Sequence, residues 1–257
     1  MKYFSRDIRL FLIVCVLMVL PSFCWANAQG VSDGMDVDKW SNMVSSLCSW
    51  GMWKLLLGGL KTTLTIFVFA AIGSVILGAL LAYLDISKRC AWFFKPFNWF
   101  VTTVHDIPSV ALMMFFYYVV FGGKMNAICV TVIALSVYVS ESLTDIFKSN
   151  VQYVGKGQIE AGLMLGLTRK QCLRYIVLPQ AVKAMLPSVT AQMKLLLRIT
   201  SYAGYLAQED LIKAVYSVRA QYSDTFLPLI IVSVMYLVIS WFIAKILHLF
   251  YVKFFRI

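Results

Sequence analysis

Residues 160–181 read EAGLMLGLTRKQCLRYIVLPQA, a basic and glycine-punctuated segment in a chain that is otherwise mostly apolar. Its first part predicts a short helix over residues 158–165. Gly166 follows, and glycine commonly ends a helix because it adopts the left-handed backbone conformation without a steric penalty. The segment therefore predicts structure of its own. A solvated amphipathic loop that merely connects two apolar stretches is the alternative.

A second short helix is predicted to begin at Thr168. Gln171 stands three residues later and completes a T-x-x-Q capping box, in which each side chain satisfies a backbone N–H of the other residue. This helix carries three basic residues, Arg169, Lys170 and Arg174. Leu178-Pro179 then predicts a stop and a new helical start, because the first position of a helix tolerates proline. The predicted order is helix, stop, helix, stop.

The composition is that of a membrane protein. Of 257 residues, 61% are hydrophobic and only 14% are charged, and the mean hydropathy is +0.80. Soluble domains are about 45–50% apolar and about 25% charged. Apolar stretches of about twenty residues recur, each long enough to cross a hydrocarbon core of about 30 Å as a helix. The alternating short strands of an outer-membrane barrel are absent from the sequence. We therefore predict an all-α polytopic membrane protein.

The N-terminal 28 residues predict a signal peptide. They contain a basic start, an eleven-residue apolar core and an Ala26-x-Ala28 ending, which is the pattern of cleavage after Ala28. A retained N-terminal transmembrane helix is the alternative. Residues 29–51 are expected to form a short extracytoplasmic segment, and residues 52–257 the transmembrane domain. Five spans are predicted in that domain, at residues 55–84, 97–121 (broken at Pro108), 127–147, 181–199 and 226–250.

The distribution of basic residues predicts the orientation. With the N-terminus inside, 14 of the 23 lysines and arginines fall in cytoplasmic segments and five fall outside, as the positive-inside rule requires. The polar segment at about 150–180 and the C-terminus are therefore expected in the cytoplasm. The same rule accounts for the net charge of +11, so that charge does not indicate nucleic acid.

The residue spacing in the cytoplasmic segment follows a known pattern. Glu160-Ala161 is followed by Gly166 and, after nine further residues, by Ile176-x-Leu178-Pro179. This arrangement resembles the EAA loop of ABC importer permeases in residue type and in spacing. Further stretches, over about residues 52–250, resemble the polar-amino-acid branch of that family: Gly59-Leu60-x-x-Thr63-Leu64, His105-Asp106-Ile107-Pro108, Leu143-Thr144-Asp145-Ile146-Phe147, Gly157-Gln158-Ile159-Glu160-Ala161 and LLRITS at residues 196–201.

The resemblance implies a five-helix permease subunit of an ATP-driven, binding-protein-dependent importer of polar amino acids or similar small solutes. The loop would be a coupling helix that docks into a separate ATPase, a role carried over to Glu160, Ala161, Gly162, Gly166, Leu167 and Pro179. Glu160 is expected to form either an ion pair to the ATPase or a first-turn contact favoured by the helix dipole. The implied partners are two ATPase subunits that bind the ATP, a second identical or related permease subunit, and an extracytoplasmic solute-binding protein, at a bacterial cytoplasmic (inner) membrane.

The substrate path is expected near Pro108, Glu141, Thr200 and Ser201. Several neighbouring positions depart from the residues usual in the branch, namely Asp106, Ile107, Leu112 and Ile199, which implies an unusual substrate. Glu141 and Asp145 stand one helical turn apart, as do Lys194 and Arg198. Ionisable groups in a membrane face a cavity or one another. We interpret the pairs either as a path for a charged solute, with Glu141 contacting a cationic group, or as ion pairs between helices and charges near the interface. The lone His105 is interpreted as interfacial.

The sequence lacks the motifs of other function classes. No GxxxxGK[ST] phosphate-binding loop occurs, so the chain is not expected to hydrolyse ATP or to carry a cofactor itself. The six cysteines show no CxxC spacing and predict free thiols without a zinc site. No nucleophile motif indicates an enzyme, and the internal repeats of a secondary carrier are not seen. The alternatives left open are a permease for another small solute and a degenerate permease-like scaffold without transport.

Overall fold

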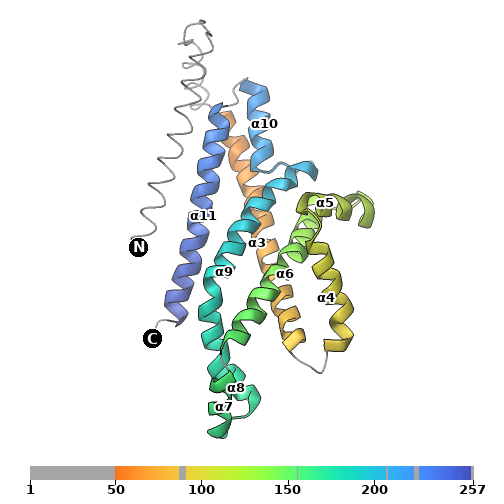
Figure 1. The fold of residues 1–257 in the computed structure, drawn as a ribbon. Helices are drawn as coiled ribbons and strands as arrows, with labels where there is room; N and C mark the ends of the chain where they lie inside the picture. The colour runs from red at the N-terminus through yellow and green to blue at the C-terminus, as the bar shows by residue number, and fades with distance from the viewer. Residues whose placement is uncertain (1–49, 87–90, 155, 207, 223–225, 256–257) are drawn as a thin grey trace, which may run out of the picture. The chain divides into compact units, whose positions relative to one another are not determined.

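The computed structural model describes residues 50–86, 91–154, 156–206, 208–222 and 226–255. Every regular element in these ranges is a helix (Figure 1), which confirms the all-α prediction. The predicted signal peptide or N-terminal helix, residues 1–28, lies outside the described residues. So does all but the end of the predicted extracytoplasmic segment, residues 29–51.

Three long helices confirm the first, third and fifth predicted spans. They are α3 (Trp50–Ile86), α6 (Ala127–Tyr153) and α11 (Phe226–Phe255), and each contains a stretch that is long and apolar enough to cross a membrane. α3 has 37 residues, which corresponds to about 55 Å at the usual helical rise. It is therefore longer than the hydrocarbon core, and its end turns extend beyond it.

The second predicted span consists of two helical segments at a sharp angle. α4 (Ala91–His105) is followed by α5 (Ser109–Met114) and its π-helical continuation η1 (Phe115–Val120). The segments on either side of the break are bent by 117°. The break lies at Pro108, as predicted, because proline has no N–H to continue a helix and disfavours helical geometry in the residue before it. The size of the bend was not predicted from the sequence.

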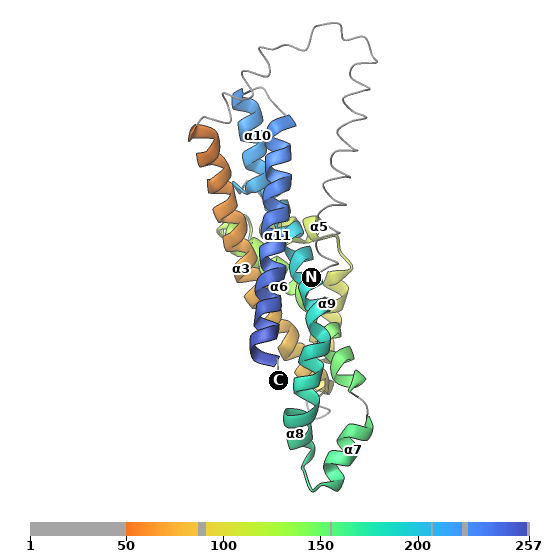
Figure 2. The ribbon, with the colours of Figure 1, turned by 90° about the vertical axis from the view of Figure 1, so that its left-hand side faces the viewer.

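The fourth predicted span lies within α9 (Leu178–Ile199). α9 is not among the described helices that are long and apolar enough to cross a membrane, and its sequence includes Lys183, Lys194 and Arg198. It packs against both α6 and α11 (Figure 2), and its Met193, Leu196 and Leu197 side chains are buried. One face of α9 is thus apolar and packs in the core, and the other face carries polar side chains.

Small residues allow α3 and α6 to approach closely. A Cβ added to Gly78 would lie 2.8 Å from the Cβ of Leu143, which is closer than side chains tolerate. Hydroxyl groups of α6 also donate to carbonyls of α3, from Thr144 to Gly78 at 3.3 Å and from Ser136 to Ala70 at 3.4 Å. Small residues and interhelical hydrogen bonds are the usual means of helix association in lipid.

Buried polar contacts join α3 to the start of α10 (Leu211–Tyr222). The Leu211 N–H donates to Thr63 Oγ1 at 3.1 Å, and the Lys213 N–H donates to Asp210 Oδ1 at 2.8 Å. A Cβ on Gly59 would lie 2.6 Å from the Asp210 carbonyl oxygen, so glycine is required there. Asp210 is fully buried, and this burial raises the pKa of its carboxyl above the ordinary value, against the lowering effect of the backbone N–H donors.

Candidate functional site

The loop hairpin, residues 156–177, projects from one end of the helical bundle (Figures 1 and 2). Its first helix is α7 (Lys156–Met164), and Gly166 ends that helix with a φ of 81°. The Gly166 N–H donates to the Leu163 carbonyl, and the Leu167 N–H donates to the Gly162 carbonyl, each at 3.0 Å. These bonds form the Schellman pattern of a helix C-terminus. The predicted first helix and its glycine stop are confirmed.

The predicted capping box at the second helix, α8 (Arg169–Cys172), is also confirmed. The Thr168 N–H donates to Gln171 Oε1 at 2.8 Å, and the Gln171 N–H donates to Thr168 Oγ1 at 3.4 Å. Two backbone donors at the helix start are thereby satisfied within four residues.

The predicted second stop, at Leu178-Pro179, is wrong. α8 continues without a break through a π-helical turn, η2 (Leu173–Val177), into α9. The Leu178 N–H donates to the Leu173 carbonyl, five residues back. This wider turn precedes Pro179, which has no N–H of its own and would interrupt a regular α-helical ladder. The hairpin is therefore connected to α9 by one continuous helix.

The two arms of the hairpin pack tightly on each other. A Cβ on Gly162 would lie 2.7 Å from Cys172 Sγ and 2.9 Å from Ile176 Cδ1. The close approach that Gly162 permits is thus to its own chain. Cys172 Sγ is also 3.8 Å from the Ile159 carbonyl oxygen, to which it donates. Glycine at this position allows α7 to lie flat against α8 and η2.

The hairpin is anchored to the ends of two long helices. Val154, at the end of α6, packs with Val177 and Ala181 in a small buried cluster. A hydrogen bond of 2.6 Å from Gln180 Nε2 to Gln158 Oε1 joins α9 to α7. A displacement of the hairpin would consequently be transmitted to both α6 and α9.

The tip of the hairpin exposes apolar side chains. Met164 is 91% exposed and Leu165 is 83% exposed, although they lie at the end of an ordered helix. Glu160 and Ala161 are also exposed. Glu160 is the fifth residue of α7, so the expected first-turn contact with the helix dipole is wrong. Within the described part of the chain, no ion pair of Glu160 is formed.

The residues expected on the substrate path lie in two places. At the first, α4 faces α6 just before the Pro108 break. Thr102 Oγ1 donates to Glu141 Oε1 at 3.1 Å, and His105 Nε2 lies 3.2 Å from Ser142 Oγ. The His105 ring also stacks on Tyr138, with centroids 4.8 Å apart. His105 and Thr102, one turn apart on α4, thus contact the adjacent α6 residues Ser142 and Glu141, and the interfacial position of His105 stays a prediction.

At the second place, Thr200 and Ser201 begin η3 (Thr200–Leu206). Thr200 is fully buried, and its hydroxyl donates to the Leu197 carbonyl at 2.7 Å. The Ser201 hydroxyl donates to the Arg198 carbonyl at 2.7 Å. α5, which follows Pro108, packs against η3. Pro108 thus adjoins both the α4–α6 contact and η3. Among the described contacts, none joins Glu141 directly to the hydroxyl group of Thr200 or Ser201.

The two predicted charge pairs have different environments. Asp145 lies 3.5 Å from Lys148, which also forms a 2.8 Å ion pair with Asp85 of α3. Lys194 is half-buried and Arg198 is exposed. Among the described residues, no ion pair joins Glu141 or Asp145 to these two cations. Asp145 thus belongs to an ion-pair cluster at the ends of α3 and α6, and Glu141 belongs to the α4 junction.

Comparisons with known proteins place this architecture in a family. Residues 74–255 match the family described as binding-protein-dependent transport system inner membrane component. The glutamate/aspartate import permease protein GltK of Escherichia coli O6:H1 is 31% identical over 183 residues, which cover 66% of this chain and 78% of that protein. The probable glutamine ABC transporter permease protein GlnM of Bacillus subtilis is 29% identical over 192 residues, covering 72% and 87%.

A solved structure shares the fold. It is an amino acid ABC transporter crystallised with histidines, is 25% identical, covers 77% of this chain and 92% of its own, and gives a TM-score of 0.68. These relatives are transporter subunits and not enzymes. With a family match over most of the transmembrane domain, the chain belongs to the binding-protein-dependent transport system inner membrane components, the multi-pass membrane permease subunits of ABC importers.

Proposed function

We propose that the chain imports a polar amino acid or a similar small polar solute, and that the loop hairpin couples it to a separate ATPase. The observation that carries the coupling role is the exposed apolar tip at Met164 and Leu165. Large apolar side chains that project from an ordered helix outside the bundle indicate a protein contact. Glu160 and Ala161 lie exposed on the same helix and complete the proposed docking surface with Gly166 and Leu167.

The anchoring contacts supply a mechanical link for this role. The ATPase would hold α7, and its movement would reach α6 through the Val154 cluster and α9 through the continuous α8–η2 helix. Gly162 keeps the two arms together as one rigid unit. Pro179 lies where that unit enters α9, behind the π-helical turn. In this proposal Gly162 and Pro179 transmit force, and they do not contact the ATPase.

The orientation follows the distribution of basic residues. We place the hairpin and the C-terminus in the cytoplasm, with residues 29–51 outside and the N-terminal 28 residues acting as a signal peptide or an extra helix. One subunit provides half of a translocation path, so a second identical or related permease completes it. Two ATPase subunits meet the hairpins, and a solute-binding protein meets the opposite end.

The path is proposed to run along the α4–α6 junction. The names of the relatives include glutamate, aspartate and glutamine, arginine and L-cystine. Glu141 accepts a hydrogen bond from Thr102 and has no cationic partner among the described residues, so it is suited to contact an ammonium or guanidinium group. Thr200 is buried in this conformation and would reach the path after a rearrangement of η3.

The test of the coupling role is co-purification of the ATPase with the tagged chain from its native membrane, followed by an ATPase assay. Met164→Ser/Leu165→Ser changes two exposed side chains and leaves the hairpin packing intact. We expect this variant to lose the ATPase or its stimulation by substrate. Tyr216→Ser changes an exposed side chain of α10, away from the hairpin. It is the control and should retain both.

An ATPase that remains bound and stimulated in the double variant would overturn the assignment of the hairpin tip. A bound and active ATPase without uptake of any solute in proteoliposomes would instead favour the degenerate scaffold.

A further inference from the structure

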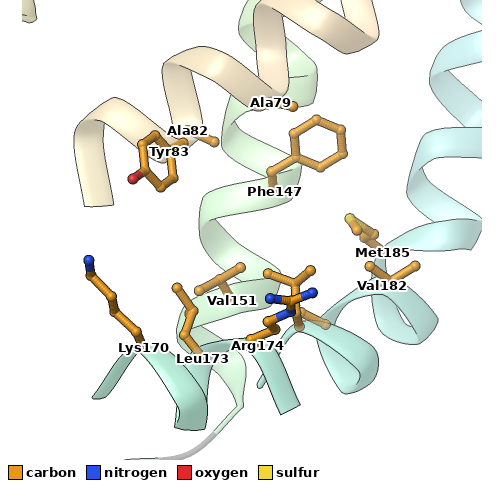
Figure 3. A pocket seen from close by; sticks show the side chains of 12 residues that line it. Ala79, Ala82, Tyr83, Phe147, Val151, Lys170, Leu173, Arg174, Val182 and Met185 are labelled. Atoms are coloured by element: carbon orange, nitrogen blue, oxygen red, sulfur yellow. The ribbon is translucent and has the colours of Figure 1, made fainter. Parts of the chain in front are cut away.

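A pocket of about 630 Å³ lies where the hairpin meets the bundle (Figure 3). Its walls come from the end of α3, the end of α6 and the start of α9. The apolar residues that form most of them include Ala79, Tyr83, Phe147, Val151, Val182 and Met185. α8 and η2 line the pocket on the side away from the bundle (Figure 3).

Two cations line this otherwise apolar pocket. Lys170 and Arg174 come from successive turns of α8 and η2, and Figure 3 shows them on the floor of the pocket on either side of Leu173, with Lys170 extending toward the end of α3 near Tyr83. Arg174 also lies 5.9 Å from the Tyr175 ring centroid. In the described ranges neither cation forms an ion pair. Both side chains are exposed to solvent, so their charged ends are available to an anion at the mouth of the pocket, and an anion there would also offset the weak repulsion between like charges four residues apart on a helix.

The depth of the pocket fits a membrane interface. Tyr83 is three residues from the end of α3, and Val151 is two residues from the end of α6. Ala79 and Met185 lie one turn further into the bundle. The cations therefore sit at the level where spans end, and the apolar walls extend from there toward the hydrocarbon core.

We propose that this pocket binds one anionic phospholipid, with its headgroup against Lys170 and Arg174 and an acyl chain along the apolar walls. Basic pockets between transmembrane helices on the cytoplasmic side are suited to anionic headgroups. A polar solute would leave its hydrogen-bonding groups unsatisfied against these walls. The pocket is thus distinct from the proposed path. Its assignment to the cytoplasmic leaflet rests on the orientation proposed above.

Such a lipid would contact the moving part of the molecule. Its headgroup would touch α8 and η2, and its chain would touch α3, α6 and α9. It would brace the hairpin against the bundle and make coupling depend on the anionic lipid content of the membrane.

Native mass spectrometry of the full chain, with whatever subunits accompany it, tests the proposal. The protein is extracted in mild detergent with equal amounts of phosphatidylglycerol and phosphatidylethanolamine. We expect one retained phosphatidylglycerol, and roughly 30-fold weaker retention in Lys170→Gln/Arg174→Gln because two basic contacts are lost. Arg169→Gln/Lys183→Gln removes two charges from the same end of the protein but outside this pocket, and should retain the lipid.

A second variant separates the lipid from other anions. Ala79→Trp fills the apolar wall and leaves both cations in place, so it should also lose phosphatidylglycerol. Retention of the lipid in either pocket variant, or equal retention of both lipids by the wild type, would overturn the proposal. So would displacement of the lipid by inorganic phosphate, or loss of the ATPase from Lys170→Gln/Arg174→Gln with lipid binding unchanged, because the cations would then serve a free anion or a protein partner. The lipid readout does not depend on coupling, so Met164→Ser/Leu165→Ser should leave it unchanged even if the proposed function is wrong.

Discussion

The loop hairpin and the α4–α6 junction are built in different ways. The hairpin is held by contacts within about twenty residues of sequence: a Schellman stop at Gly166, a capping box at Thr168 and the Gly162 contact with Cys172. The junction depends on pairs nearly forty residues apart, from Thr102 to Glu141 and from His105 to Ser142. By resemblance, the hairpin keeps the spacing of the EAA loop, with Gly162 in place of the second alanine, whereas Asp106, Ile107 and Leu112 beside the junction depart from the residues usual in the family branch. Such a contrast would arise if the family shares its contact with the ATPase while the residues that contact the substrate vary.

The strongest test of the contrast is Gly162→Leu. The new side chain would overlap Cys172 and Ile176, and overpacking of this kind costs about 1–3 kcal/mol. We expect the hairpin arms to separate and substrate-stimulated ATPase activity to be lost, with the bundle still folded. Gly157→Leu is the matched control on the same helix, since nothing lies within 4 Å of a Cβ there.

Activity in Gly162→Leu equal to that of Gly157→Leu would show that the hairpin is not a rigid coupling unit. Loss of the folded protein on size-exclusion chromatography would show that the hairpin stabilises the whole bundle, and the contrast between the two regions would be weaker.

The second test concerns the junction. Glu141→Ala removes the charge and the hydrogen bond from Thr102, whereas Glu141→Gln removes the charge and keeps an acceptor for that bond. If Glu141 contacts a cationic group, both variants should raise the KM for a cationic substrate roughly 10- to 100-fold, the range expected for a charged hydrogen bond. ATPase co-purification should not change.

Uptake measured in proteoliposomes for cationic and neutral amino acids gives the comparison. A wild-type KM in Glu141→Gln would assign Glu141 to the packing of α4 on α6. An equal increase in KM for neutral substrates would exclude a charge contact.

Sequence reasoning succeeded where the determining contacts are local. Gly166 and the Thr168–Gln171 box act within a few residues, so their motifs were sufficient to predict them. Pro108 predicted a break, but the 117° bend depends on what α5 packs against. The stop expected at Pro179 was wrong because a π-helical turn accommodates the proline and lets the helix continue.

Asp210 shows the limit of sequence reasoning most clearly. Its position at the start of α10 depends on two residues about 150 positions earlier. Gly59 leaves room for the Asp210 backbone because it has no Cβ, and the Thr63 hydroxyl accepts from the Leu211 N–H. Only the folded chain brings these residues together. The family resemblance included Gly59 and Thr63, but it did not predict their contacts with Asp210 and Leu211. The buried carboxylate had no local signal beyond an acidic residue before an amphipathic helix.

The smallest expected effect belongs to the cap of the second helix. Thr168→Ala removes the side-chain acceptor for the Gln171 N–H, and loss of a cap costs about 1 kcal/mol. Thr168→Asn retains an acceptor and is the control. Because α8 continues into η2 and α9, the loss should loosen only the start of the hairpin's second arm. Amide hydrogen exchange of residues 169–172 should become roughly fivefold faster in the alanine variant, with coupling nearly unchanged. If coupling falls as far as in Gly162→Leu, the position of the hairpin is set by its cap as much as by its internal packing.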